Sequence, residues 1–290
     1  GSPYEGLTFL GLVGLLHSPR PDVQDASEKC IEAGIKIVMV TGDHPSTAKN
    51  IALAVGLVDD SNVRPLHGSV IKKVESLSDE DSELVSDSLI IARVSPEQKL
   101  ELVKMKQESG LVVAMTGDGV NDAPALRQAD IGIAMGLRGT QVAREAADIV
   151  LKDDSFGTIV SAVEQGRIIY GNIKKFIFYL ISCNVSEIMI VAIASFALMP
   201  LPILPLQILF LNLVTDIFPA LALGMGEGDE HIMKEPPRDP KEPLLTRRRW
   251  LGIAGYGALI TSSVLGALLY AIHGLGYESE EAVSVSFLTL

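Results

Sequence analysis

The sequence has 290 residues, of which 48% are hydrophobic and 5% aromatic, and its formal net charge at pH 7 is −12. This length suffices for one large domain or two of moderate size, and the acidic balance argues against nucleic acid as a partner. The averages conceal a change near residue 171. Short apolar runs alternate with charged segments before it, and apolar stretches long enough to cross a bilayer follow it.

The first part of the chain alternates strand patterns with helix patterns. Apolar runs typical of strands occupy residues 7–16, 35–40, 89–94, 111–115, 131–135 and 149–151. Helix-start signals such as Pro45 and Pro96 follow these runs, and glycines such as Gly34 and Gly56 end the helices. The alternation predicts a mostly parallel sheet with helices on both faces. Ligands of such sheets bind at the carboxyl ends of the strands.

One of these strand ends carries two carboxylates next to glycines. The segment from Thr116 to Asp122 reads Thr-Gly-Asp-Gly-Val-Asn-Asp and precedes a helix signal at Pro124. Oxygen ligands on a tight loop suit Mg²⁺, which retains part of its water shell and binds beside a phosphate. The competing interpretation is a turn whose Asp and Asn side chains only cap a helix. Seven consecutive residues of this type favour a Mg²⁺ site on Asp118 and Asp122.

Two further polar segments lie at the start of predicted helices. Thr41 and Gly42, followed by Asp43, offer a hydroxyl and backbone N–H groups that suit a phosphate oxygen. Lys99 offers a compact positive charge that would neutralise a transferring phosphoryl group. Each has an ordinary explanation when taken singly, as a turn or as a solvated lysine. Together with the loop 116–122 on one sheet, they favour phosphoryl transfer.

The three segments resemble signatures of the P-type cation-transporting ATPases, and they occur in the family's order over more than half of the soluble part. The resemblance implies an incomplete α/β haloacid-dehalogenase-like domain with a Rossmann-like parallel sheet, followed by an all-α bundle of transmembrane helices. It also implies ATP as the substrate and Mg²⁺ as the cofactor, bound by Asp118 and Asp122. The residues to which it assigns catalytic roles are Thr41, Gly42, Asp43, Lys99 and Asn121.

One family signature is missing from this chain. The family is phosphorylated on the aspartate of an Asp-Lys-Thr-Gly sequence, which does not occur here. The chain also reads His17-Ser18-Pro19-Arg20 where the family usually reads Asp-Pro-Pro-Arg. The resemblance therefore implies that residues 1–155 are the C-terminal part of a phosphorylation domain, whose missing N-terminal parts are partners within the same pump. We expect the chain by itself not to turn over ATP.

A helical pattern begins at Ser155 and continues to about Leu198. Because this length exceeds what a bilayer requires, we expect a stalk helix over 156–175 that runs into a transmembrane helix over 176–198. Further spans are predicted at 206–224 and 250–272, with the start of a truncated one at 282–290. Basic residues at 174–175 and 247–249 place residues 1–170 and the loop 225–249 on the cytoplasmic side of a multi-pass membrane protein.

Two of these predicted spans contain carboxylates. Ionisable groups inside a membrane indicate a functional site by default. The residues that we expect to form a cage of oxygen ligands across two helices are Asn184, Glu187, Asn212, Thr215 and Asp216. Such a cage suits a hard cation, Ca²⁺ above all. The competing interpretation, polar groups that only hold helices together, is weaker because neither helix offers a basic partner to the two carboxylates.

These helices resemble the fifth and sixth transmembrane helices of sarcoplasmic-reticulum-type calcium pumps. Sodium–potassium pumps carry Asp at the place of Asn212, and Golgi-type calcium/manganese pumps lack the Glu found at 187. The resemblance implies part of an ATP-driven cation pump, Ca²⁺ favoured, that works through an aspartyl phosphate and in which phosphorylation switches ion access. The alternatives are a Na⁺ or H⁺ pump of the same type and a non-catalytic pump-like regulatory or interaction fragment. Cys30 and Cys183 are interpreted as small core residues.

Overall fold

The computed structural model describes residues 6–11, 20, 22–59, 62–71 and 79–290. The chain forms two compact units, Gly1–Val160 and Ser161–Leu290. The boundary between them falls inside one helix, α7 (Phe156–Phe196), so the chain passes from the first unit into the second in helical conformation.

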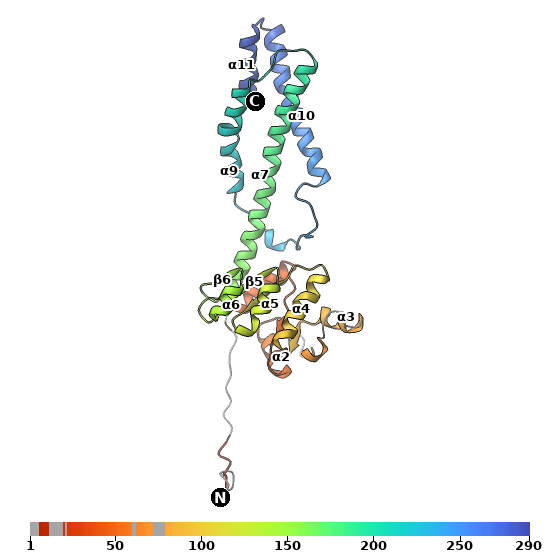
Figure 1. The fold of residues 1–290 in the computed structure, drawn as a ribbon, viewed down its shortest axis with the longest axis vertical. Coiled ribbons are helices and arrows are strands. Elements are labelled where there is room, and N and C mark those ends of the chain that lie inside the picture. Colours follow the sequence, from red (N-terminus) through yellow and green to blue (C-terminus); the bar gives the residue numbers. More distant parts are fainter. Residues whose placement is uncertain (1–5, 12–19, 21, 60–61, 72–78) are drawn as a thin grey trace. The chain divides into compact units, whose positions relative to one another are not determined.

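The strands of the first unit form two parallel sheets (Figure 1). One sheet has the order β1-β3-β2 and the other has the order β4-β5-β6. Every strand pair is parallel, as predicted, but the strands lie in two sheets rather than one. Among the described residues, β1 and β4 each occupy an edge of their sheet. The bounds are β1 Met39–Val40, β2 Leu66–His67, β3 Ile90–Ala92, β4 Ala114–Gly117, β5 Ile131–Met135 and β6 Ile149–Leu151.

Helices alternate with these strands. They are α1 Asp22–Glu32, α2 Pro45–Ala54, α3 Asp79–Asp87, α4 Pro96–Glu108, α5 Ala123–Gln128 and α6 Gln141–Ala146, with short 3₁₀ turns η1 Gly68–Val70 and η3 Val120–Asp122. Apolar faces of α2 and β3 pack together through Ala48, Ala52 and Ile90. In the second sheet, Leu126 and Ala134 pack together with Ala143, so α5 and α6 bury against β5. These contacts fix the loops that follow the strands.

The predicted strand over residues 7–16 is wrong in the part that the structure describes. Residues 7–11 form no strand, and Leu7, Phe9 and Leu10 are exposed to 74%, 78% and 96%. Residues 12–16 lie outside the described residues. An apolar run supplies strand propensity, but a strand also needs a neighbour to pair with, and none of the described strands pairs with residues 7–11.

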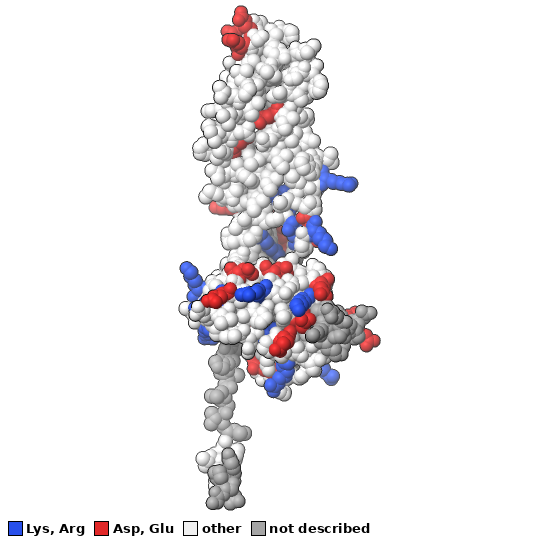
Figure 2. All heavy atoms as spheres, viewed as in Figure 1, with Lys and Arg blue, Asp and Glu red and all other residues white. Residues whose placement is uncertain are grey.

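The second unit is helical. After α7 come α8 Pro205–Phe210, the π-helical turn η4 Leu211–Thr215, α9 Ile217–Gly224, the 3₁₀ turn η5 Ile232–Lys234, α10 Arg247–His273 and α11 Ser279–Thr289. Three segments are long and apolar enough to cross a membrane, namely Phe156–Phe196, Pro205–Gly224 and Arg247–His273. Charged side chains are sparse on these helices in Figure 2. The chain is therefore a membrane protein with a soluble segment.

The helix α10 packs closely against α7 within this unit. Gly257 allows the approach, because a Cβ there would lie 3.1 Å from Cγ1 of Val185. One turn further on, the hydroxyl of Thr261 donates to the carbonyl of Ser186 at 3.4 Å. The stretch of α7 that precedes Glu187 is thus held by a neighbouring helix.

Candidate phosphate and cation sites

The loop after β4 is built around a buried ion pair. Asp122 is 7% exposed, and its Oδ1 lies 2.6 Å from Nζ of Lys99 at the start of α4. Its Oδ2 accepts the backbone N–H groups of Gly119 at 3.1 Å and Asp118 at 3.4 Å. A Cβ at Gly117 would stand 2.6 Å from Cβ of Asp122, so only glycine fits there. Both oxygens of Asp122 are therefore engaged in holding Lys99 and the loop.

The first turn of α4 positions Lys99. Ser95 and Gln98 form a capping box, with the Ser95 N–H donating to Oε1 of Gln98 at 2.9 Å. The backbone N–H of Glu97 itself and the Ser95 hydroxyl lower the pKa of the Glu97 carboxyl below its ordinary value. The turn therefore presents backbone donors, and its lysine is already directed towards the loop after β4.

Asp118 has a different environment from Asp122. It is exposed, as is Asn121, and its carboxylate accepts no hydrogen bond from any described residue. No group of three or more His, Cys, Asp or Glu side chains that could hold a metal exists in the described part of the chain. Mg²⁺ commonly binds one or two carboxylates, several waters and a phosphate. The donor set fits that pattern through Asp118, whereas the oxygens of Asp122 already have partners.

The Thr41–Asp43 loop follows β1. The Thr41 hydroxyl accepts the N–H of Asp43 at 3.1 Å, and the N–H of Arg93 donates to the Asp43 carbonyl at 3.1 Å. Gly42 and Asp43 are exposed. The N-cap of the following helix is His44, whose Nδ1 accepts the N–H of Ser46 at 3.3 Å. Among the described residues, no hydrogen bond or ion pair joins this loop to the loop 116–122, so the structure brings Lys99, Asp118 and Asp122 together without Thr41.

The second unit contains a buried acidic cluster. Glu187 on α7 is 7% exposed and Asp216, between η4 and α9, is 6% exposed. The amide of Asn212 donates to both oxygens of Glu187, at 3.3 and 3.1 Å. The Tyr179 hydroxyl donates to Oδ1 of Asp216 at 3.4 Å. Oδ2 of Asp216 is buried and has no hydrogen-bond partner among the described residues, so one carboxylate oxygen is left for a ligand.

Two residues of the predicted cage lie apart from this cluster. Asn184 is exposed, and its amide donates to the carbonyl of Leu180 at 2.8 Å. Thr215 is exposed too. The reason at Thr215 is the π-helical turn, in which the N–H of Asp216 donates to the carbonyl of Leu211 at 2.9 Å. This wider turn keeps Asn212 and Asp216 inward and rotates Thr215 outward.

Tyr179 contacts the acidic cluster through Asp216, and sequence reasoning missed it. It stands eight residues before Glu187 on α7, and the helical repeat places residues at i, i+4 and i+8 on one face. That spacing, with Cys183 between them, is the signal that would have found it. A tyrosine near the end of a span is usually attributed to the membrane interface instead.

Comparisons with known proteins agree with a soluble unit followed by membrane-spanning helices. Residues 2–130 match the family model of haloacid dehalogenase-like hydrolases, and residues 200–290 match the model of the cation-transporting ATPase C-terminus. The chain is 48% identical to a calcium-transporting ATPase of Bacillus subtilis (strain 168) over 98% of its length. It is 44% identical to a P-type sodium-transporting ATPase4 of Toxoplasma gondii over 93% of its length.

A third relative is the sodium/potassium-transporting ATPase subunit alpha-1 of Oreochromis mossambicus, 42% identical over 89% of the chain. The chain spans only 32%, 21% and 27% of these three relatives, in the order given. Within the chain, however, the similarity extends over both units.

Proposed function

The chain belongs to the P-type cation-transporting ATPases, and from that premise we propose that it is part of an ATP-driven pump for Ca²⁺. The observation that carries the proposal is the buried cluster of Glu187, Asn212 and Asp216 on helices that can cross a membrane. Two buried carboxylates without a basic partner among the described residues are costly in apolar surroundings. A bound cation would stabilise them, and all-oxygen ligands suit Ca²⁺.

The ligand groups have distinct roles in this proposal. Glu187 supplies carboxylate oxygens, and Asn212 holds it by donating to both of them. Asn212 keeps its amide oxygen as a further ligand. Asp216 contributes Oδ2, the oxygen that has no hydrogen-bond partner among the described residues. Tyr179 holds the other oxygen of Asp216 in place.

The phosphoryl-transfer site belongs to the first unit. Asp118 would hold Mg²⁺, which supplies charge neutralisation next to the phosphate when bound. Lys99 carries the positive charge that faces a transferring phosphoryl group, and Asp122 orients it from 2.6 Å. Thr41 and Gly42 offer a hydroxyl and an N–H to the phosphate oxygens. The phosphorylated aspartate would lie in the same pump but outside this chain, because the chain contains no Asp-Lys-Thr-Gly.

A Na⁺ pump is the second candidate, since two of the relatives are named for sodium transport. The test compares uptake of ⁴⁵Ca with uptake of ²²Na by vesicles that contain the full-length protein and are supplied with ATP and Mg²⁺. We expect ATP-dependent ⁴⁵Ca uptake and a phosphoenzyme whose formation depends on Ca²⁺. Uptake of ²²Na alone would replace the ion assignment, and uptake of neither ion without any phosphoenzyme would refute the pump itself.

A further inference from the structure

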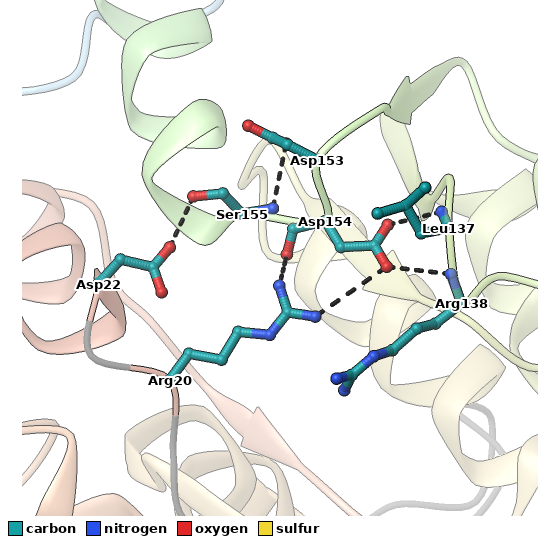
Figure 3. Close-up of polar contacts among 7 residues, drawn as sticks. All are labelled: Arg20, Asp22, Leu137, Arg138, Asp153, Asp154 and Ser155. Carbon is teal, nitrogen blue, oxygen red and sulfur yellow. Dashed lines mark hydrogen bonds and ion pairs between the residues drawn. The ribbon is translucent and has the colours of Figure 1, made fainter.

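A buried carboxylate connects the second sheet of the first unit to the start of α7 (Figure 3). Residues 152–155 lead from β6 to α7, and the side chain of Asp154 is only 1% exposed. Its Oδ1 accepts the backbone N–H of Leu137 at 2.9 Å, and its Oδ2 accepts the backbone N–H of Arg138 at 3.0 Å. Asp154 therefore links the loop that follows β5 to the segment that leads into α7.

Arg20 and Asp22 contact the same junction. The Arg20 guanidinium donates to the backbone carbonyl of Asp154 and lies 4.0 Å from its carboxylate. The Ser155 hydroxyl donates to Asp22 at 2.6 Å and accepts the N–H of Gly157 at 3.2 Å, in the first turn of α7. These contacts join the start of α1 to the first turn of α7.

The other end of the loop after β5 is bonded to the candidate Mg²⁺ residue. The backbone N–H of Thr140 donates to the backbone carbonyl of Asp118 at 2.8 Å. Residues 136–140 are thus held at one end by Asp118 and at the other by the Asp154 carboxylate. A Cβ at Gly139 would lie 1.9 Å from the carbonyl of Met135, so the loop is tightly folded. Because this loop is short and tightly folded, a displacement of Asp118 would be transmitted through it to Asp154.

The backbone at Asp154 is strained. Its φ is 53°, in the left-handed region that is unfavourable for a residue with a Cβ. A turn that needed only this geometry would be satisfied by glycine. Burial raises the pKa of Asp154, but N–H donors from Leu137 and Arg138 and the Arg20 charge outweigh it and hold that pKa below its ordinary value. A strained, buried and ionised residue indicates that its carboxylate is required.

We propose that Asp154 is a positioning residue that couples the phosphate site to the cation site. A change at Asp118, when Mg²⁺ and a phosphoryl group are bound, would pass through Thr140 to the amides of Leu137 and Arg138. From there it would reach Asp154 and the first turn of α7, the helix that carries Glu187. This inference rests on the proposed function, and it assigns to Asp154 a role in which it touches neither substrate nor ion.

Hydrogen exchange of the full-length protein in lipid nanodiscs tests the coupling. The probe is Mg²⁺ with beryllium fluoride, which mimics an aspartyl phosphate. In the unmodified protein we expect slower exchange in peptides that cover 136–140 and 153–165. In Asp154→Asn, the probe should still protect the loop 116–122, while the protection of 153–165 falls by about tenfold or more, because the anionic acceptor of the two amides is lost. Protection of 153–165 that matches the unmodified protein would overturn the proposal.

A control and a second pair of variants make the result decisive. Glu164→Gln removes an exposed carboxylate from α7 and should leave the exchange unchanged. Thr140→Pro removes the N–H that donates to Asp118 at a φ of −64°, which proline adopts, whereas Thr140→Ala retains that N–H. Both variants lose the side-chain cap that Thr140 gives to α6, but only the proline variant also loses the N–H. We therefore expect only Thr140→Pro to lose protection of 153–165. If Asp154→Asn fails to fold, equal protection in the two Thr140 variants overturns the proposal.

Transport measurements separate this proposal from the proposed function. If the unmodified protein forms no phosphoenzyme, the pump assignment fails, whatever Asp154 does. If it does form one, Asp154→Asn should form phosphoenzyme within about twofold of the unmodified level, while cation uptake per phosphoenzyme falls about tenfold. A parallel loss of phosphoenzyme and uptake would reduce Asp154 to a purely structural role and overturn the coupling.

Discussion

Lys99 and Asp122 form an ion pair in which Nζ lies 2.6 Å from Oδ1, and their side chains are 19% and 9% exposed. Loss of one partner leaves the other charge buried and uncompensated, which costs about 3 kcal/mol or more. Lys99→Met should therefore abolish phosphoenzyme formation and lower the unfolding midpoint of the full-length protein. In the double variant Lys99→Met with Asp122→Asn, the unfolding midpoint should return most of the way to that of the unmodified protein. Phosphoenzyme formation should remain absent. A double variant as unstable as the single one would mean that the pair is not the source of the stability.

The glycine of the same loop offers a steric test. A Cβ at Gly117 would meet Cβ of Asp122 at 2.6 Å, whereas the nearest atom to one at Gly119 would be Oδ2 of Asp122, at 3.3 Å. Gly117→Ala should therefore displace Asp122 and reduce the phosphoenzyme level by about tenfold or more, and Gly119→Ala should reduce it less. Phosphorylation from radiolabelled ATP at saturating cation measures both. An equal loss in the two variants would contradict the role given to Asp122.

The burial pattern separates the five predicted cation ligands into two groups. Glu187→Gln and Asp216→Asn remove buried carboxylates and should raise the Ca²⁺ concentration for half-maximal phosphorylation by about 100-fold or more. Asn184→Ala and Thr215→Ala change exposed residues and should raise it by less than about threefold. The readout is the Ca²⁺ dependence of phosphoenzyme formation. Large effects at Asn184 and Thr215 would favour the cage predicted from helical spacing instead.

Tyr179 is expected to influence cation affinity through Asp216. Tyr179→Phe removes the hydroxyl that lies 3.4 Å from Oδ1 of Asp216 but keeps the ring. The Ca²⁺ affinity should fall about threefold to tenfold, the effect of one modest hydrogen bond, with little change in the maximal rate. Tyr256→Phe is the matched control, because Tyr256 is exposed and contacts Phe178 through its ring. Equal effects of the two variants would remove Tyr179 from the site.

The pH dependence of stability should report Asp154. Its pKa lies below the ordinary value of 3.8, so its ionised form stabilises the folded protein above that value. The contribution is lost only as the pH falls through the lower folded pKa. The difference in unfolding midpoint between the unmodified protein and Asp154→Asn should therefore stay constant from about pH 5 to 8 and narrow only in stronger acid. A difference that disappeared by about pH 6 would show that Asp154 is not held ionised by its partners.

The sequence predicted the parts of the fold that local patterns determine. The strands at 131–135 and 149–151 have the predicted bounds, and α2 and α4 begin at the predicted Pro45 and Pro96. The pairing of strands that lie far apart in the sequence was harder to predict. The division into two sheets depends on which strands find partners, and the two-residue strand Leu66–His67 is too short for any periodicity to indicate it.

The candidate sites show the same limit. Glu187 and Asp216 were predicted as ligands because carboxylates in apolar helices have few explanations, and the structure buries both side chains. Asn184 was predicted to face the same cage, but the structure leaves it exposed, because a helical amide can donate to the carbonyl four residues earlier, as it does to Leu180. Asp154 was overlooked for a different reason: its importance depends on a loop after β5, and nothing in the local sequence connects residue 154 with Leu137 and Arg138.

The π-helical turn at Leu211–Thr215 carries one residue more than a regular helix would need to cover the same rise. Removing one of the residues between Asn212 and Asp216 would convert this turn to an ordinary α-helical one, and the two residues, then three apart, would still lie on one helical face. The residue that the π-helical turn adds is accommodated on the outward side, where Thr215 is exposed. A deletion at Leu213, Val214 or Thr215 should therefore disturb the buried cluster less than a substitution of Asn212 or Asp216.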